Sequence, residues 1–453
     1  MTDKTIAAIS TPSGEGGIGV IRISGRSAIA VADRVFKSVS GKKLCELDGY
    51  TALFGHIYSD GELADECVAT VFLSPKSYTG EDVCELSCHG GGLILSSVLR
   101  AVLQEGASLA EAGEFTKRAF LNGKMDLAEA ESVMGLISAK SREELRLQMS
   151  AKSGRISKKI SEIEGFLLEL SANFAAFSDY PDEDLPELSE DNFRRLLSLA
   201  KNGLDALLST YDCGKVLREG IKTAIVGKPN VGKSTLMNML SGEKRSIVTD
   251  IAGTTRDIVE NTVNLGGITL LLADTAGIRQ TDDKVETVGV ELAKERLQTA
   301  QLVLAVFDTS LPLDKDDEEI LSLLSADNTV ILLNKSDVGQ AISADKFVGF
   351  KTMQVSAKTG DGINALEKAV KEISGTANLD PSAAVLLNER QLELAKKAYS
   401  AVLEAEHLLA SGFTIDAVGV AVDDALSHLY TLDGKRVTNE VADEVFRRFC
   451  VGK

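Results

Sequence analysis

Apolar and polar residues alternate in three different ways along the chain. Residues 1 to about 120 contain short β-rich runs, such as Gly19–Ile23 and Val83–Ser87, separated by glycine and proline, with one helical stretch at Leu93–Gln104. This first region predicts an α+β domain. From Met125 to about Tyr211, apolar residues recur every three or four positions, which is typical of helices with one buried face.

The region from about residue 220 to 375 has a third pattern, in which strands alternate with helices. Its predicted strands are Lys222–Gly227, Ile268–Asp274, Leu302–Asp308, Val330–Asn334 and Met353–Ser356. Such alternation favours a mostly parallel sheet with helices on both faces. Beyond Pro381 the helical pattern returns, and the predicted helices are Asn388–Leu409, Ile415–Leu429 and Asn439–Phe449.

These patterns predict one helical domain that is interrupted in the sequence. The helical stretches on either side of the α/β region each have an apolar face that neither can bury alone, so we expect them to pack together. We therefore expect an N-terminal domain at residues 1–120, a helical domain at 121–215 and 377–453, and an inserted α/β domain at 216–376. The acidic, proline-containing segment Asp179–Asp191 is interpreted as a solvated turn or linker.

Composition narrows the range of functions. The chain has 49 Lys and Arg against 67 Asp and Glu, a net charge of -18. A surface this acidic repels phosphate backbones, which argues against a general nucleic-acid-binding protein and confines any RNA contact to a local basic surface or to a partner. Six scattered cysteines and an N-terminus without a signal pattern predict reduced thiols and a cytoplasmic protein. No apolar run reaches the roughly 18 residues needed to cross a membrane.

One octapeptide predicts a phosphate site. Gly227–Ser234, with the sequence GKPNVGKS, follows a predicted strand directly and precedes the helical stretch Thr235–Leu240. Its glycines allow backbone N–H groups to face phosphates at the helix N-terminus. Lys233 is expected to reach the β- and γ-phosphates, and the Ser234 hydroxyl to bind Mg²⁺.

Three further motifs follow in order, each at the carboxyl end of a predicted strand. In Asp274–Gly277 a carboxylate can hold a water of the magnesium ion, and the glycine amide can approach a γ-phosphate. In Asn334–Asp337 the Asp337 carboxylate can accept hydrogen bonds from two donors of guanine that adenine lacks. Ser356–Lys358 would support the base. Because doubly wound sheets bind ligands at this edge, the combination predicts a GTPase.

The loop Ser246–Asp257 lies between the first two motifs, and one of its threonines is expected to complete the magnesium shell. Ile278, directly after Asp274–Gly277, is apolar, so the water-orienting glutamine of Ras-type enzymes is missing from that place. The predicted GTP-binding residues are Asn230, Val231, Gly232, Lys233, Ser234, Thr235, Thr249, Asp250, Ile251, Ala252, Gly253, Thr254, Thr255, Asp274, Thr275, Ala276, Gly277, Asn334, Lys335, Asp337, Ser356, Ala357 and Lys358.

Two other patterns are interpreted as decoys. Gly14–Gly19 fits the glycine spacing of a dinucleotide-binding loop, but a β-rich run follows it where that motif requires a helix. Cys84, Cys88 and His89 lack a second pair of ligands nearby, which leaves a four-ligand zinc site unsupported.

The nucleotide motifs described above resemble those of the MnmE family of tRNA-modification GTPases, also called TrmE. Three further segments share this resemblance, which covers essentially the whole chain: GGIGVIRISG near the N-terminus, GEFTKRAFLNGKMDLAEAE and the final FCVGK. The resemblance implies an α/β plus α fold: a Ras-like P-loop GTPase domain, the G domain, inserted into a discontinuous helical domain and preceded by an α+β folate-binding-like N-terminal domain. It also implies a homodimer that works with the flavoprotein MnmG. The pair would add an aminomethyl or carboxymethylaminomethyl group at C5 of the wobble uridine, U34, of certain tRNAs.

The same resemblance assigns roles at the nucleotide. Asn230, Thr249, Ile251 and Thr254 would bind K⁺, and Thr255 would join Ser234 on Mg²⁺. The potassium ion would supply the positive charge that other GTPases take from an arginine. Glu286 would be catalytic by positioning the attacking water, which partly answers the apolar Ile278; taken by its residue type alone, it is an ordinary solvated helix carboxylate.

A tetrahydrofolate derivative, 5-formyl- or 5,10-methylene-tetrahydrofolate, is implied as donor of the one-carbon unit. The residues implied for it are Arg22, Glu85, Lys124 and Lys453, whose charges suit a pterin ring and a glutamate tail. By residue type alone Arg22 and Lys124 are more often surface charges. Cys450 matches the terminal cysteine of the family and is a second catalytic candidate, although a free cysteine is more often a small buried apolar residue.

A second function class stays open at this point. A regulatory or ribosome-assembly GTPase would share the nucleotide motifs and act as a binding switch. The N-terminal region and the final FCVGK favour the modification enzyme, whereas an RNA-binding domain after the α/β region would favour the switch.

Overall fold

The computed structural model describes residues 4–179, 189–242, 261–272, 297, 299–380, 382–447 and 449–452. These residues form two compact units. The first contains residues 4–134 and 426–452, and the second contains the described residues between 135 and 425. Each unit therefore joins segments that lie far apart in the sequence.

The first unit is built on a seven-stranded sheet with the strand order β3-β4-β5-β6-β2-β1-β7. Helices α1 (Ala28–Val35) and α2 (Gly92–Gln104) share one core with it, where Val31 and Val98 are fully buried or nearly so. The strands are β1 (Ile6–Ile9), β2 (Gly16–Ser24), β3 (Phe36–Ser38), β4 (Thr51–Ser59), β5 (Glu62–Phe72), β6 (Val83–Gly90) and β7 (Ser108–Leu109). The sequence pattern predicted β1, β2, β6 and the end of β5 but missed β3, β4 and β7. β3 and β7 are very short, and glycine, histidine and serine interrupt the apolar residues of β4.

The C-terminal end of the chain belongs to this first unit. Helices α3 (Glu114–Leu121) and α15 (Asn439–Phe446) pack with the start of α4 (Leu127–Ser138) around the aromatic rings of Phe446 and Phe449. Helix α15 ends at Phe446, three residues before the predicted end at Phe449. The chain forms a tighter turn there, in which the Phe449 N–H donates to the Phe446 carbonyl at 3.0 Å. The prediction of a helix to Phe449 was wrong.

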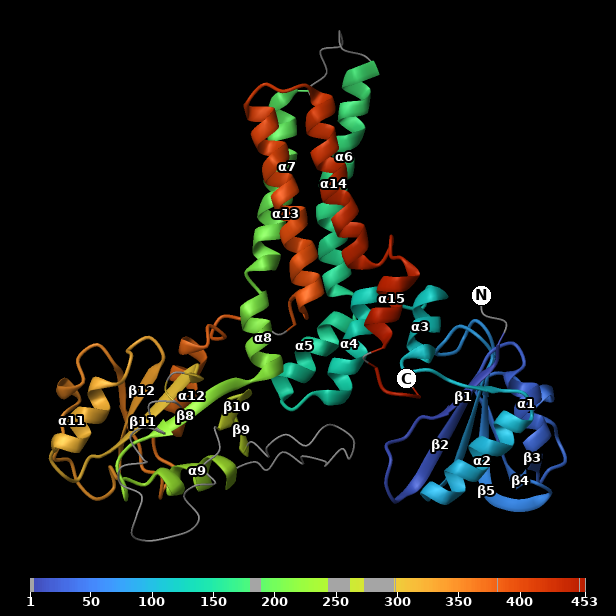
Figure 1. The fold of residues 1–453 in the computed structure, drawn as a ribbon, viewed down its shortest axis with the longest axis horizontal. Helices are drawn as coiled ribbons and strands as arrows, with labels where there is room; N and C mark the ends of the chain where they lie inside the picture. Colours follow the sequence, from blue (N-terminus) through green and yellow to red (C-terminus); the bar gives the residue numbers. More distant parts are fainter. Residues whose placement is uncertain are drawn as a thin grey trace. The chain divides into compact units, whose positions relative to one another are not determined.

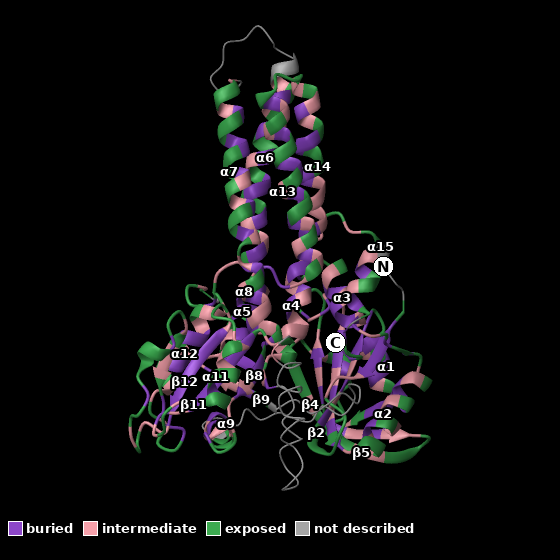
Figure 2. Cartoon of the chain, turned by 60° about the vertical axis from the view of Figure 1, so that its left-hand side comes forward, coloured by how far each residue is buried: buried purple, intermediate pink, exposed green. Residues whose placement is uncertain are grey.

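Long antiparallel helices dominate the helical part of the second unit (Figure 1). Buried residues run along α7 and α13, and α7 packs against both α6 and α13 (Figure 2). The helices are α5 (Arg142–Lys152), α6 (Arg155–Asp179), α7 (Glu190–Leu208), α8 (Tyr211–Glu219), α13 (Glu389–Ala410) and the part of α14 (Ile415–Asp433) up to Ala425. Helices from before and after the α/β region thus bury each other's apolar faces, as the pattern predicted.

The α/β part has a six-stranded sheet with the order β13-β12-β11-β8-β10-β9, parallel except for β9. Its elements are β8 (Ile221–Val226), α9 (Lys233–Gly242), β9 (Asn261–Leu265), β10 (Ile268–Leu272), β11 (Leu302–Asp308), α11 (Lys315–Ser322), β12 (Thr329–Asn334), β13 (Lys351–Gln354) and α12 (Ile363–Ile373). β9 was not predicted. β13 ends two residues before the predicted Ser356, because Ser356 leaves the ladder to pair with Asp361 in an isolated bridge.

Among the residues with described positions, we find no helix that is both long and apolar enough to cross a membrane.

Candidate functional site

The loop after β8 has a backbone that only certain residues can adopt. Gly227 has a φ of +147°, and a Cβ atom there would lie 2.3 Å from the carbonyl oxygen of Val306 on β11. Gly232 has a φ of +98°, and a Cβ atom there would lie 2.3 Å from Nδ2 of Asn334. Asn230 is also left-handed, with a φ of 64°. The two motif glycines are therefore required by close packing as well as by backbone conformation.

Lys233 opens helix α9 and turns its amine back into this loop. Its Nζ donates to the Gly227 carbonyl at 2.6 Å and to the Lys228 carbonyl. Burial lowers the pKa of Lys233 below its ordinary value. Phosphate oxygens would offer this desolvated amine far stronger acceptors than two neutral carbonyls.

Asn334, at the end of β12, connects two loops of the site. Its side chain is almost fully buried, and its Nδ2 donates to the Val231 carbonyl at 2.8 Å. Its Oδ1 accepts from the Ala357 N–H at 2.9 Å. One asparagine thus fixes the phosphate loop, Gly227–Ser234, relative to the loop that follows β13.

Asp337 is exposed three residues beyond Asn334. Its Oδ1 accepts a hydrogen bond from the Ser356 hydroxyl at 2.7 Å, and this bond holds the pKa of Asp337 below its ordinary value. Ser356 is fully buried, so its hydroxyl fixes the direction of the carboxylate. An ionised, oriented carboxylate can accept from two guanine donors at once.

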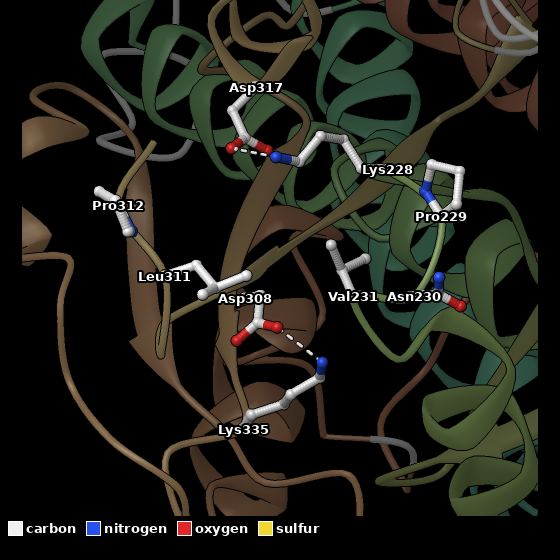
Figure 3. A pocket seen from close by; sticks show the side chains of 9 residues that line it. All are labelled: Lys228, Pro229, Asn230, Val231, Asp308, Leu311, Pro312, Asp317 and Lys335. Atoms are coloured by element: carbon white, nitrogen blue, oxygen red, sulfur yellow. Dashed lines mark hydrogen bonds and ion pairs between the residues drawn. The ribbon is translucent and has the colours of Figure 1, made fainter. Parts of the chain in front are cut away.

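A cavity of about 170 Å³ lies between the phosphate loop and the ends of β11 and β12 (Figure 3). Two ion pairs stand at its walls. Lys228 Nζ lies 2.8 Å from Oδ2 of Asp317, and Lys335 Nζ lies 2.6 Å from Oδ2 of Asp308. The remaining lining residues are Pro229, Asn230, Val231, Leu311 and Pro312.

Part of the predicted nucleotide site lies outside the described residues. These residues are Thr249, Asp250, Ile251, Ala252, Gly253, Thr254, Thr255, Asp274, Thr275, Ala276, Gly277 and Glu286. The structure does bring together the other predicted residues, from the phosphate loop, Asn334–Asp337 and Ser356–Lys358. Their assignment to GTP stays a prediction.

A second cluster occupies the first unit. Arg22 on β2 and Glu85 on β6 are register partners, and Arg22 Nε donates to Glu85 Oε1 at 2.8 Å. The guanidinium lies over the rings of Tyr78 and Phe115, 5.2 and 5.7 Å from their centroids. The Tyr78 hydroxyl is 2.9 Å from Thr116 Oγ1, which ties this cluster to α3.

The C-terminal segment reaches the same helix. The Gly113 N–H, at the start of α3, donates to the Cys450 carbonyl at 3.3 Å, and the Cys450 residue is exposed. Val451 pairs with Ala112, and the Ser10 hydroxyl donates to the Gly452 carbonyl at 3.0 Å.

The two remaining candidates of this region are placed differently. Lys124 Nζ donates to the Pro75 carbonyl at 3.0 Å, on the loop that carries Tyr78. Lys453 lies outside the described residues. Of the four residues implied for the folate, the structure therefore brings Arg22 and Glu85 into direct contact.

The two sequence decoys have structural explanations. Gly16–Gly19 is the beginning of strand β2, so no helix follows these glycines. Cys84 and Cys88 are buried in the sheet core. In the part of the chain with described positions, no group of three His, Cys, Asp or Glu side chains is arranged to hold a metal ion.

The sequence did not identify Tyr78, Phe115 and Asp308 as residues of these two clusters. Tyr78 and Phe115 lie 56 to 93 residues from Arg22 in the chain and meet it only through the sheet and α3. Asp308 ends an apolar strand, as Asp274 was expected to do, and that position is the one signal that marks it.

Comparisons with known proteins cover both units. Residues 127–450 match the family model described as MnmE helical domain, and residues 5–124 match the one described as GTP-binding protein TrmE N-terminus. The chain is similar to the tRNA modification GTPase MnmE of Clostridioides difficile (strain 630), with 41% identity over 456 residues, covering 100% of this chain and 99% of the relative. The protein of that name from Lactococcus lactis subsp. cremoris (strain SK11) is 42% identical over 451 residues, covering 99% and 98%.

Among solved structures, the chain is similar to Era in a crystal structure with MgGDPNP and nucleotides 1506–1542 of 16S ribosomal RNA. The identity is 31%, covering 40% of this chain and 66% of that chain, with a TM-score of 0.26.

Proposed function

Because this chain belongs to the MnmE family of tRNA modification GTPases, we propose that it hydrolyses GTP with stimulation by K⁺ and, together with MnmG, modifies C5 of the wobble uridine. The family membership itself makes the chain a GTP-hydrolysing enzyme of tRNA modification, with tRNA as its substrate. Its fold is a Ras-like P-loop GTPase domain set within a helical domain that follows a TrmE-type N-terminal domain. The ribosome-assembly alternative loses its support.

The described residues suit a magnesium complex of GTP. The Lys233 amine would bind the phosphates, and the exposed Ser234 hydroxyl would bind Mg²⁺. The Asp337 carboxylate would accept the hydrogen bonds of guanine. P-loop GTPases bind Mg²⁺ with the nucleotide as a class. Thr255 would be the second magnesium ligand, and Glu286 would position the attacking water.

Asn230 supports the proposed potassium site. It is exposed on the phosphate loop and has a left-handed φ of 64°. Its amide oxygen is the type of ligand that a hard cation prefers. Thr249, Ile251 and Thr254 would complete the set. When bound, K⁺ would contribute positive charge to the transition state of phosphoryl transfer.

One observation carries the modification chemistry in this proposal: the C-terminal Cys450 segment is held on α3, the helix that also contacts the Arg22–Glu85 pair through Tyr78. A cation and a carboxylate on adjacent strands suit a pterin with a glutamate tail, so a tetrahydrofolate derivative fits the charges present. Lys124 and Lys453 would meet the same ligand. The domain limits 1–120, 121–215 with 377–453, and 216–376 remain part of this proposal.

We further propose a cytoplasmic homodimer that joins MnmG in a larger complex. The modified group would be aminomethyl or carboxymethylaminomethyl, and the one-carbon unit would come from the folate. Cys450, exposed beside α3, is the proposed second catalytic residue.

The test combines a deletion strain with calorimetry. Cells that lack this protein are complemented with the parent chain or with Arg22→Ala, and the wobble nucleosides of their tRNAs are analysed by mass spectrometry. Loss of the C5 modification in Arg22→Ala, with weaker binding of 5-formyltetrahydrofolate and unchanged GTP hydrolysis, supports the proposal. Intact modification in the deletion strain refutes it, and intact folate binding in the variant removes Arg22 from the site.

A further inference from the structure

The segment from Asp308 to Asp317 connects β11 to α11 and forms one wall of the cavity beside the phosphate loop (Figure 3). Its carboxylates bind two lysines that come from different loops of the nucleotide site. Lys228 belongs to the phosphate loop, and Lys335 belongs to the loop that recognises the base. The segment therefore touches both halves of the site without being one of its sequence motifs.

Hydrogen bonds to Ser310 orient the Asp308 carboxylate toward Lys335. Its Oδ1 accepts from both the backbone N–H and the hydroxyl of Ser310, at 3.0 and 2.6 Å, which leaves Oδ2 pointing at Lys335 Nζ. Burial alone would raise the pKa of Asp308, but these hydrogen bonds outweigh it and leave the pKa below its ordinary value. Lys335 itself has a left-handed φ of 65°, an unfavourable conformation that persists only where the surroundings fix it.

Lys228 is bound in a similar way at the other end of the segment. Its Nζ contacts Asp314 at 2.5 Å and Asp317 at 2.8 Å, and the Asp317 side chain is only 6% exposed. Asp314 caps α11 and forms a reciprocal capping box with Asp317, so both carboxylates have fixed positions. The carbonyl of this same Lys228 accepts a hydrogen bond from Lys233.

We propose that Asp308 and Asp317 are positioning residues for GTP binding: through Lys335 and Lys228 they hold the base-recognition loop and the phosphate loop at the spacing that one nucleotide requires. Neither carboxylate needs to touch GTP in this role. Asp317 fixes Lys228, whose carbonyl holds the phosphate-binding Lys233, and Asp308 fixes the backbone between Asn334 and Asp337.

The experiment measures nucleotide release and turnover on the full-length chain. Asp308→Asn and Asp317→Asn keep the shape of the side chain but remove its charge. We expect each variant to release mant-GDP at least fivefold faster and to raise the KM for GTP by a similar factor, with kcat at saturating GTP within twofold of the parent. Asp316→Asn is the matched control, because Asp316 lies on the same turn of α11 and pairs with neither lysine in the contacts described above.

A variant cycle distinguishes positioning from a general loss of structure. Lys228→Gln removes the same ion pair from its other end, so the double variant Asp317→Asn with Lys228→Gln should release mant-GDP no faster than the faster single variant. Additive effects in the double variant, or release rates within twofold of Asp316→Asn for both Asp308→Asn and Asp317→Asn, overturn the proposal. If Asp317→Asn unfolds α11, the proposal is tested with Lys228→Gln and Asp308→Asn instead, each of which should release mant-GDP at least fivefold faster than the parent.

Discussion

Replacing Asn334 by alanine should lower the free energy of unfolding of the α/β part of the chain. The Asn334 side chain is the joint between the phosphate loop and the loop after β13. Alanine keeps the backbone of β12 but removes both hydrogen bonds. It leaves the Val231 carbonyl and the Ala357 N–H without that partner in a region where both residues are buried.

The magnitude follows from these two groups. A buried polar group left without its partner costs about 1–3 kcal/mol, so Asn334→Ala should lower the unfolding free energy by about 2–6 kcal/mol. Each kcal/mol corresponds to roughly 2–4 °C in the unfolding temperature of a domain of this size. We therefore expect a shift of at least about 4 °C, and about 12 °C at the middle of both ranges.

The assay is differential scanning calorimetry of the full-length chain with and without GDP. The transition that GDP moves to higher temperature reports the α/β part, because a ligand stabilises only the part that binds it. Asn328→Ala is the matched control. Asn328 is a half-buried asparagine just before the same strand. Its Nδ2 donates to the Ala300 carbonyl at 3.2 Å, and its Oδ1 accepts a long hydrogen bond of 3.4 Å from the Thr329 hydroxyl.

A hydrogen bond at a half-buried position contributes about 0.5–1.5 kcal/mol, so the two bonds of Asn328 contribute about 1–3 kcal/mol. Asn328→Ala should therefore shift the transition by about half as much as Asn334→Ala. Equal shifts in the two variants would show that Asn334 does not join the two loops, and the reasoning about the site would fail.

Three other outcomes follow from the structure. Asp337→Asn should shift nucleotide preference from guanosine toward xanthosine triphosphate, measured by competition against mant-GDP; unchanged GTP affinity would remove the base-recognition role. Replacing K⁺ by Na⁺ should slow GTP hydrolysis in the parent and change little in Asn230→Ala; equal parent rates in both salts would contradict the ion's role. The hydrogen bond that protonated His89 donates from Nδ1 to the Asp65 carboxylate raises the pKa of His89, so the stabilising charge on His89 is present below its ordinary pKa and lost as pH rises through the raised one. NMR titration should show that rise, and Asp65→Asn should abolish it.

The phosphate loop was predictable because its constraints are local. Gly227, Gly232 and Lys233 lie within seven residues, and a strand before them and a helix after them were both visible in the pattern. Asp337 was predictable for a related reason, since parallel strands end at a common edge of the sheet. In these places the local sequence and the topology point to the same site.

Other parts of the site depend on contacts that leave no local pattern. Lys228 looked like an ordinary variable position of its motif, and its two aspartates lie 86 and 89 residues further along the chain. Tyr78 has no motif at all, and only the sheet register and α3 place it under Arg22. Strand β9 was missed because Asn261, Thr262 and Asn264 dilute its two apolar residues, although both of these are buried.

The pairing of the last residues with the first unit has a consequence for synthesis. Val451 pairs with the Ala112 backbone, and the Gly452 carbonyl accepts a hydrogen bond from the Ser10 hydroxyl, 442 positions earlier in the chain. The surroundings of the first strand are therefore complete only after these late residues have been synthesised. Contacts between positions so far apart slow folding, because closing so long a loop costs conformational entropy before the contacts can stabilise the fold. Removing residues 450–452 would therefore disturb the surroundings of the first strand as well as those of α3.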